Sequence, residues 1–382
     1  MSYLALYRKY RPTNFNEVIG QKHIVTSLKN QILNDQISHA YLFTGTRGTG
    51  KTSIAKIFAR AINCEHPIDA SPCGECPTCK AMLNPNNLDI IEIDAASNNR
   101  VDEIRDLREK VKYPPVNGRY KVYIVDEVHM LTDSAFNALL KTLEEPPKHA
   151  VFILATTEVQ KLPATILSRC LRFDFKLLEN DEIEGLLKRI FDDSVIKYDN
   201  ESVALIARLG EGSVRDALSV AEMCVAYTNK NVTYSSVIEA VGAIDKKVLS
   251  NLAKYILKGE VNAILNTINS ILEKGKVVSQ LAKDLANYFR DLAVVKTCEN
   301  ANEILKYPTD ILSDMEGLAK ENSVTKILNA FKCLSSLDNE FRYSTNPRSL
   351  FELNVLNLTL DNSLSLEERV KTLEDKINSV LP

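Results

Sequence analysis

Short apolar runs, separated by longer amphipathic stretches, dominate the first half of the chain. The densest runs, such as Val122–Val125 and Val151–Leu154, are rich in β-branched and other large apolar residues and contain no charged position. Runs of this kind are typical of parallel strands that helices cover on both faces. The strands predicted in this way are His39–Thr44, Leu88–Asp94, Tyr120–Asp126, Ala150–Thr156 and Leu171–Phe175.

Apolar residues recur at helical spacing between these runs. The segment Thr52–Ile62 places its apolar residues on one face of a helix, and the segment at residues 101–111 does the same. Strands that alternate with helices predict a three-layer α/β domain with a five-stranded parallel sheet at residues 1–178. The two helical stripes consist of Ile54, Ala55, Phe58 and Ala59, and of Val101, Ile104, Leu107 and Val111.

Beyond Leu178 the strand pattern ends and only helical periodicity continues. This predicts a small helical domain at residues 179–242 and a second all-helical domain at residues 243–382. A last 4-3-4-3 pattern of apolar residues, at residues 366–380, is long enough for a packed helix but too short to establish a coiled coil. The other predicted helices are Glu182–Phe191, Glu201–Leu209, Ser213–Tyr227, Val248–Leu257, Val261–Leu272, Val278–Val295 and Val324–Leu337.

Composition and charge add a few limits. With 45% hydrophobic and 25% charged residues among 382, the chain has the make-up of an ordinary globular protein. A net charge of −3 provides no general basic field, so any DNA contact requires a local patch. No apolar run reaches the roughly 18–20 residues that span a bilayer, and residues 1–9 lack the apolar core of a secretory signal. We therefore expect a cytoplasmic protein without membrane contact, in which thiols stay reduced and clustered cysteines bind metal.

The segment at residues 45–52 matches the phosphate-binding pattern G-x-x-x-x-G-K-S/T, between a predicted strand and a predicted helix. Its glycines let backbone N–H groups point toward phosphate oxygens, and the helix N-terminus favours negative charge. Lys51 is predicted to neutralise the β- and γ-phosphates of ATP, and Thr52 to hold Mg²⁺. The residues assigned to nucleotide binding are Gly45, Thr46, Arg47, Gly48, Thr49, Gly50, Lys51, Thr52 and Ser53.

A second motif ends the apolar strand at residues 120–126 with two adjacent carboxylates. Asp126 is predicted to be the anion on the magnesium side, and Glu127 the base that orients the attacking water. A solvated acidic turn at the end of a strand is the alternative. Behind a phosphate-binding loop, the pair favours ATP hydrolysis over a simple nucleotide switch.

Four cysteines follow the predicted nucleotide-binding helix with the spacing C-x8-C-x2-C-x2-C. Four thiolates suit tetrahedral Zn²⁺ with no open position, so the predicted site is structural rather than catalytic. A redox role for one Cys-x2-Cys pair is the alternative, and His66 could replace one thiolate. The predicted zinc ligands, which define a zinc module at about residues 64–79, are Cys64, Cys73, Cys76 and Cys79.

The order of these motifs resembles the AAA+ ATPases. In that family the strand after the acidic pair ends in a polar sensor of the γ-phosphate, which the resemblance assigns to Thr157, with Thr156 as the alternative. The sequence Ser-Arg-Cys around Arg169 looks like the signature of clamp-loader ATPases. It implies that Arg169 reaches the ATP of a neighbouring subunit as an arginine finger. The sequence Gly-Ser-Val-Arg-Asp resembles the second sensor, so Arg215 is expected to cover the γ-phosphate in its own subunit.

Over nearly its full length the chain resembles the gamma/tau family of the bacterial DNA polymerase III clamp loader. The resemblance implies a helical lid at residues 179–242 and a collar domain at residues 243–382, through which subunits oligomerise. It also implies that Tyr7, Arg11, Val18 and Ile19 frame the adenine. The stretches that carry the resemblance are residues 7–12, 18–21, 93–97, 125–130 and 138–147.

Clamp loaders of this family follow DNA phosphates with helix N-termini and basic side chains, and the resemblance places such a helix after Ser97 as its cap. Arg100 and Arg105 are the candidate phosphate contacts. Asn98 stands where family members often carry a further basic residue. Two acidic residues in the same segment make a solvated helix face the alternative. Phosphate binding without sequence preference would suit a loader, which accepts any primer–template junction.

The resemblance implies an ATPase that opens a ring-shaped sliding clamp when it binds ATP and releases it on primer–template DNA after hydrolysis. No polymerase site is expected in the chain itself. The implied partners are delta-type and delta-prime-type loader subunits, further copies of the chain, the clamp and the DNA. The chain stops near the end of the collar domain, as expected of a gamma-length form or a shortened tau.

Two other classes of function remain open. One is an AAA+ motor that translocates DNA, such as a branch-migration helicase, for which the four-cysteine insertion is not expected. The other is a scaffold subunit that does not hydrolyse ATP. Such subunits lose the phosphate-loop lysine or the acidic pair, and both are intact here.

Overall fold

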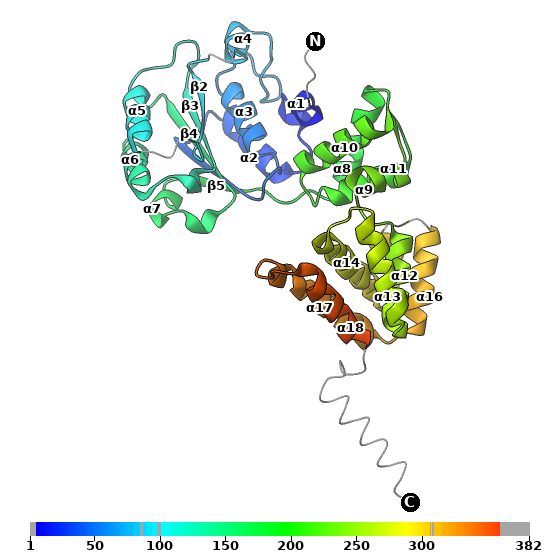
Figure 1. Cartoon of the computed structure of the whole chain (residues 1–382). Coiled ribbons are helices and arrows are strands. Elements are labelled where there is room, and N and C mark those ends of the chain that lie inside the picture. Colours follow the sequence, from blue (N-terminus) through cyan, green and yellow to red (C-terminus); the bar gives the residue numbers. More distant parts are fainter. Residues whose placement is uncertain (1–4, 85–86, 98–100, 306, 308, 360–382) are drawn as a thin grey trace, which may run out of the picture. The chain divides into compact units, whose positions relative to one another are not determined.

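Two compact units make up the chain, residues 1–232 and residues 233–382 (Figure 1). The computed structural model describes residues 5–84, 87–97, 101–305, 307 and 309–359. The last predicted helix, at residues 366–380, lies outside these ranges. The predicted domain boundaries at residues 178 and 242 remain predictions.

A five-stranded parallel sheet forms the centre of the first unit, with the strand order β2-β3-β4-β1-β5. The sequence prediction of five parallel strands is confirmed, with ends that differ by at most two residues. Because β1 and β3 lie on either side of β4, the segments that follow all three strands meet at one edge of the sheet. The strands are β1 (Ala40–Thr44), β2 (Ile90–Asp94), β3 (Lys121–Asp126), β4 (Ala150–Thr156) and β5 (Leu171–Asp174).

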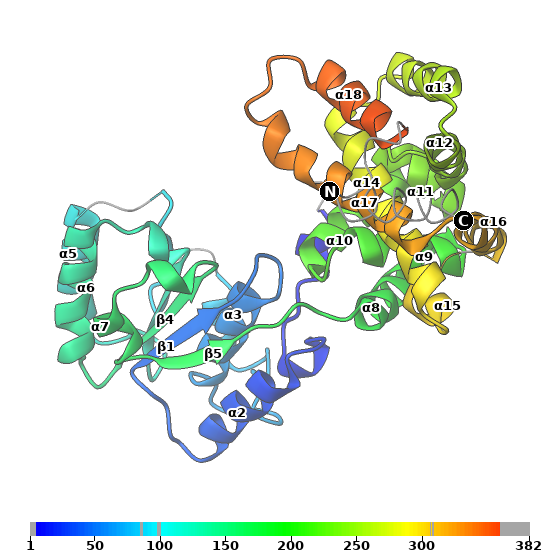
Figure 2. The same cartoon turned by 90° about the horizontal axis from the view of Figure 1, so that it is seen from below.

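Helices cover both faces of this sheet, as predicted (Figure 2). Side chains of β1 alternate between the two cores: Tyr41 packs with α2 and α3, whereas Leu42 packs with α5 and α6. This two-sided burial, which is complete or nearly so in β1, β3 and β4, explains why these central strands are dense in apolar residues. The helical segments of this layered part are α1 (Leu6–Lys9), η1 (Phe15–Glu17), α2 (Lys22–Leu33), α3 (Lys51–Ala61), α4 (Pro77–Met82), α5 (Val101–Val111), η2 (Val128–Met130), α6 (Asp133–Glu144), η3 (Val159–Lys161) and α7 (Ala164–Leu167).

Three helices follow the sheet within the same unit: α8 (Asn180–Asp193), α9 (Asn200–Leu209) and α10 (Val214–Thr228). The expectation of helices alone in this region is wrong, because β6 (Lys197–Tyr198) pairs in parallel with β7 (Asn231–Val232). Strands of two residues are too short to produce an alternating pattern, which explains why the sequence gives no sign of them.

Helices are the regular secondary structure in the described residues of the second unit (Figure 1). Its core forms around α14, in which residues such as Leu281, Leu285 and Phe289 recur at helical spacing and are fully buried. No helix in the described part of the chain has the length and apolar character needed to cross a membrane. The helices of this unit are α11 (Tyr234–Val241), α12 (Lys246–Lys258), α13 (Val261–Glu273), α14 (Val278–Thr297), α15 (Ala301–Leu305), α16 (Thr309–Glu321), α17 (Val324–Phe341) and α18 (Pro347–Thr359).

Candidate nucleotide-binding site and cysteine cluster

The phosphate-binding loop connects β1 to α3, and its three glycines have backbone conformations that side chains disfavour. Gly45, Gly48 and Gly50 have φ angles of 145°, 77° and 103°. A Cβ atom on Gly45 would lie 2.5 Å from the carbonyl oxygen of Phe175, and one on Gly48 would collide with the hydroxyl of Ser213. Glycine is therefore required at both positions. The second contact also brings the start of α10 directly against the loop.

Lys51 and Thr52 begin α3, and both polar groups have partners within the site. The Lys51 ammonium, in a side chain that is almost fully buried, donates to the carbonyl oxygens of Gly45 and Thr46 at 2.8 Å each. The Thr52 hydroxyl donates to Asp126 Oδ2 at 2.8 Å. Both groups thus lie where the phosphate-binding motif requires them, but they bond to the protein itself.

Two carboxylates, one on the last residue of β3 and one on the residue after it, influence the pKa of Lys51. Burial lowers the pKa of Lys51, while the nearby charges of Glu127 and Asp126 act in the opposite direction. Glu127 has a left-handed backbone with φ of 48°, which turns the chain sharply after the strand. An ammonium group beside two carboxylates at the end of a parallel strand is the arrangement expected of a nucleoside-triphosphate site.

The two threonines at the end of β4 have different surroundings. Thr157 donates to Glu127 Oε2 through its backbone N–H at 3.2 Å and through its hydroxyl at 3.0 Å. Thr156 is fully buried, and its hydroxyl oxygen contacts His129 Nδ1 at 3.0 Å and accepts the N–H of Glu158 at 3.0 Å. Of the two candidate sensors, Thr157 is therefore the one that contacts the acidic pair.

A cavity of about 1330 Å³ adjoins the loop and is bounded by the N-terminal segment, the acidic pair and α8 and α10. It is large enough for a nucleotide with its phosphates. Four of the residues predicted for nucleotide binding or hydrolysis do not line it, namely Gly45, Thr46, Thr157 and Arg169. The predicted residues that do line it are Tyr7, Arg11, Val18, Ile19, Arg47, Gly48, Thr49, Gly50, Lys51, Thr52, Ser53, Asp126, Glu127 and Arg215.

Several lining residues were not predicted from the sequence. Arg189 and Asp193 reach the cavity from α8, and Glu92 and Asp94 reach it from β2. Arg189 and Asp193 are four residues apart and so lie on one face of α8, but charged residues on any solvated helix face show the same spacing. No local pattern in the sequence singles these residues out.

Arg215 lies in the first turn of α10 and faces the N-terminal segment. Its guanidinium carbon is 5.2 Å from the ring centroid of Tyr7, and that of Arg8 is 5.7 Å from the same centroid. Both distances are in the range of cation–π interactions. The residue predicted to cover the γ-phosphate and a residue predicted to frame the adenine are therefore in contact.

Arg169 lies between α7 and β5, away from the cavity of its own chain. Its guanidinium donates to Glu144 Oε1 at 2.9 Å and to the carbonyl oxygen of Thr165 at 2.9 Å. The side chain is about one-third exposed, at 34%. It is thus held at the surface by residues of α6 and α7.

The predicted DNA contacts fall largely outside the described part of the chain. Arg100 is not among the described residues, and for Arg105 only the backbone, in α5, is described. Ser97, the predicted cap of this helix, donates its hydroxyl to Asp94 Oδ2 at 2.6 Å. The first described residue of the helix is Val101, and the positions between the two lie outside the described ranges, so the capping role of Ser97 stays a prediction.

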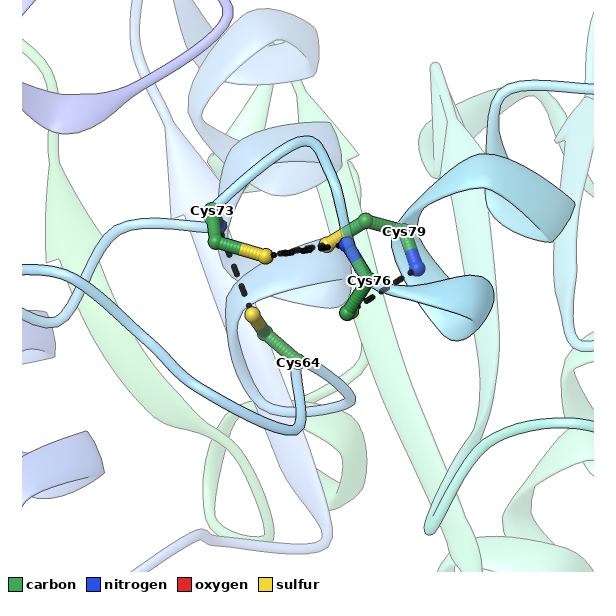
Figure 3. Close-up of side chains that lie close together, drawn as sticks. All are labelled: Cys64, Cys73, Cys76 and Cys79. Carbon is green, nitrogen blue, oxygen red and sulfur yellow. Dashed lines mark hydrogen bonds between the residues drawn. The ribbon is translucent and has the colours of Figure 1, made fainter.

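The four predicted zinc ligands converge between α3 and α4. The sulfur atoms of Cys64, Cys73, Cys76 and Cys79 all lie within 4.8 Å of one another, and none is in a disulfide (Figure 3). The sulfur atoms of Cys73 and Cys79 are 3.9 Å apart. A tetrahedron with metal–sulfur distances of about 2.3 Å has edges of roughly 3.8 Å. The cluster is therefore compatible with a tetrahedral ion such as zinc, and His66 is not part of it.

Backbone N–H groups point at these sulfur atoms. The N–H groups of Cys73, Cys76 and Cys79 donate to the sulfur atoms of Cys64, Cys73 and Cys76, each at 3.3 Å. Hydrogen bonds from the backbone of Cys76 and Glu75 lower the pKa of Cys73 to about 6, whereas burial raises the pKa of Cys64. N–H donors favour thiolates, and thiolates are the form in which cysteine binds metal.

Three protein-family models match consecutive parts of the chain. Residues 20–179 match the model described as DNA polymerase III, delta subunit. Residues 182–230 match the ATPase lid domain of the DNA polymerase III clamp loader subunit, and residues 232–373 match domain III of DNA polymerase III subunits gamma and tau.

Several curated proteins are similar in sequence. The DNA polymerase III subunit tau of Bacillus subtilis is 44% identical over 94% of this chain and 63% of its own length. Subunit tau of Escherichia coli is 43% identical over 78% of this chain and 46% of its own length. Subunit gamma of Buchnera aphidicola is 37% identical over 93% of this chain and 98% of its own length. The chain thus covers 63% of the length of the Bacillus subtilis tau relative and 46% of the length of the Escherichia coli one.

Solved structures show a weaker likeness. The RuvB Holliday junction branch migration motor of Thermotoga maritima matches with a TM-score of 0.48 and 17% identity, over 78% of this chain and 99% of that chain. The DNA clamp loader delta protein of Bacillus subtilis matches with a TM-score of 0.36 and 12% identity, over 87% of this chain and 99% of that chain. Likenesses of this extent carry no argument about function.

Proposed function

The chain belongs to the gamma/tau family of DNA polymerase III subunits, and on this basis we propose that it is an ATPase subunit of a sliding-clamp loader. The observation that carries the proposal is that the phosphate-binding loop, the acidic pair and Arg215 of α10 line the same cavity. Such a cavity lets one bound nucleotide contact the sheet and the helices after it at the same time. ATP binding can then change the angle between them.

ATP binding requires two groups of the site to change partners. Lys51 leaves the carbonyl oxygens of Gly45 and Thr46 and turns to the β- and γ-phosphates, whose charge offsets the cost of the buried ammonium. Thr52 and Asp126 separate, so that both can serve as ligands on the magnesium side. Mg²⁺ bound with ATP supplies charge neutralisation at the phosphate oxygens.

Hydrolysis depends on Glu127, which orients the attacking water and accepts its proton. Thr157 holds that carboxylate through two hydrogen bonds. Arg215 moves from the ring of Tyr7 to the γ-phosphate in its own chain, while Arg169 reaches the site of a neighbouring subunit. A guanidinium supplied in trans stabilises the charge of the transition state, so turnover requires assembly.

The remaining assignments follow from family membership. ATP binding orders several copies of the chain, together with delta-type and delta-prime-type subunits, into a cytoplasmic complex that opens a ring-shaped clamp. Primer–template DNA, held through its phosphates, triggers hydrolysis and release of the clamp. Arg100 and Arg105 are the candidate phosphate contacts. The four cysteines hold a structural Zn²⁺.

Measurement of ATP turnover tests this proposal. The chain, assembled with its loader partners, is assayed without the sliding clamp and primer–template DNA, with each of them alone, and with both together. The proposal expects the largest stimulation from the combination. Equal turnover under all four conditions would refute the loader function, and strand unwinding by the chain alone would favour a translocating motor.

A further inference from the structure

A tight turn inside the cysteine module touches the wall of the nucleotide cavity. Ile68 and Ser71 form an antiparallel bridge, with N–H to carbonyl distances of 2.9 and 2.8 Å. The two residues between them, Asp69 and Ala70, have left-handed backbones with φ of 49° and 56°. Consecutive left-handed residues that are not glycine are uncommon, so the surroundings must hold this turn in place. It lies between the first two cysteines of the cluster.

One direct hydrogen bond and one lysine bridge join the turn to η1. The hydroxyl of Ser71, which is only 4% exposed, accepts the backbone N–H of Phe15 at 3.2 Å. Asp69 forms an ion pair of 2.6 Å with Lys29 of α2, and Lys29 also donates to Asn16 Oδ1 at 2.9 Å. The turn therefore contacts two successive residues of η1, one directly and one through a lysine.

The segment that includes η1 forms one wall of the nucleotide cavity. Asn14 accepts the N–H groups of Asn16 and Glu17 at 3.1 Å each, and Glu17 accepts the N–H of Thr13 at 2.7 Å. Thr13, Glu17 and Val18 line the cavity. A short, internally bonded segment of this kind moves as one piece, so a constraint at Phe15 and Asn16 also positions the residues that line the cavity.

We propose that the cysteine module braces this wall, with Ser71 and Asp69 as positioning residues for nucleotide binding. The metal links the cysteines on both sides of the turn and so restricts the loop that contains the turn. A wall that is already in position loses less entropy when the nucleotide binds. Metal at the cysteines therefore increases nucleotide affinity, although the cysteines are not part of the phosphate-binding loop.

This inference rests on the proposed function only in that the cavity binds ATP. It assigns no chemical step to the module, so its effect falls on nucleotide binding and not on the rate of hydrolysis. A module that merely stabilises the fold would lower thermal stability and leave the affinity of the folded protein unchanged.

The test compares the full chain with a Ser71→Ala/Asp69→Asn variant. We expect ATP and ADP to bind about five- to tenfold more weakly to the variant, by calorimetric titration, with a raised KM for ATP and an unchanged kcat. The variant should retain one Zn²⁺ per chain. Thr78→Val is the matched control, because Thr78 is a buried hydroxyl in the same module that bonds to Glu65 at 2.6 Å and not to η1.

Removal of the metal provides the second arm. After a chelator has stripped the zinc and has been removed, and Mg²⁺ has been restored, wild-type protein should bind ATP as weakly as the variant does. Added Zn²⁺ should restore the affinity of the wild type, and the same treatment should change the variant little. Unchanged ATP affinity in the folded, zinc-loaded variant would overturn the inference, whatever the chelated protein does. A wild-type chain that binds no ATP would instead refute the proposed function.

Discussion

The hydroxyl of Thr157 donates to Glu127 Oε2 at 3.0 Å, and the backbone N–H of the same threonine donates to the same oxygen at 3.2 Å. Two donors on one residue fix the orientation of the carboxylate more strictly than either would alone. His129 Nδ1 lies 3.4 Å from that oxygen as well. The residue predicted to sense the γ-phosphate therefore holds the predicted catalytic base.

Replacement of Thr157 by valine should impair hydrolysis and spare ATP binding. The variant keeps the N–H donor and loses the hydroxyl, so we expect kcat to fall about tenfold while the Kd for ATP stays within about twofold. Thr157→Ser retains the hydroxyl and serves as the control. Steady-state turnover and calorimetric binding separate the two effects. A raised Kd with unchanged kcat would show that Thr157 acts on the nucleotide and not through Glu127.

Lys51→Met should weaken ATP binding by about 100-fold, because the β- and γ-phosphates lose their positive partner. The same change should alter the pH dependence of stability without nucleotide. Burial lowers the pKa of Lys51 below its usual 10.5, so the unfolded chain binds more protons between the lowered value and 10.5. The free energy of unfolding of the wild-type protein, relative to that of the variant, should therefore rise with pH across that window and be lowest below it. Urea unfolding at pH 7, 9 and 10 measures this difference, and a difference that falls with pH would contradict the prediction.

Arg169→Ala should leave ATP binding by the isolated chain intact and lower turnover of the assembled loader by about 1,000-fold, the range measured for arginine fingers. Glu144→Gln is the control, since it removes the ion-pair partner at 2.9 Å and leaves the arginine in place. That variant should retain turnover. Weaker ATP binding by an isolated Arg169→Ala chain would mean that the arginine supports its own site.

Strong periodic signals in the sequence predicted the fold correctly. The central strands are dense apolar runs, and the register that pairs Val125 with Leu154 brings the ends of β3 and β4 together, so their end residues could be expected to meet. The pair β6 and β7 could not be predicted, because two residues give no period. Helix α18 buries only Phe351 and Val355 among its residues, too narrow a stripe to be recognised.

The cavity was predictable only where motifs mark it. The glycine loop and the acidic pair have fixed spacings and line the cavity. The four cysteines, which do not line it, also gather as their spacing indicates. Arg189 reaches the cavity because α8 forms part of its wall, and no local sequence pattern encodes that placement. The bond between Ser71 and Phe15 joins residues 56 positions apart, and a serine in a turn gives no hint of such a partner.

The contact between Gly48 and Ser213 predicts coupling between the phosphate-binding loop and α10. Gly48→Ala adds a Cβ that meets the Ser213 hydroxyl, at a φ of 77°. Gly50→Ala, at a φ of 103°, adds a Cβ with no atom within 4 Å, so it shares the backbone strain without the collision. We therefore expect Gly48→Ala to lower the free energy of unfolding by about 1 kcal/mol more than Gly50→Ala.

A double-mutant cycle isolates the collision from the strain. Ser213→Ala alone should cost about 1 kcal/mol, because the Ser213 hydroxyl caps α10 by accepting the N–H of Asp216 at 3.2 Å. In the Gly48→Ala background, Ser213→Ala should cost less than it does in the wild-type chain, because it removes the hydroxyl that collides with the new Cβ. An interaction of about 1 kcal/mol in urea unfolding would establish that loop and helix touch without nucleotide. Additivity within about 0.5 kcal/mol would show that α10 stands away from the loop, so that its closure must await ATP.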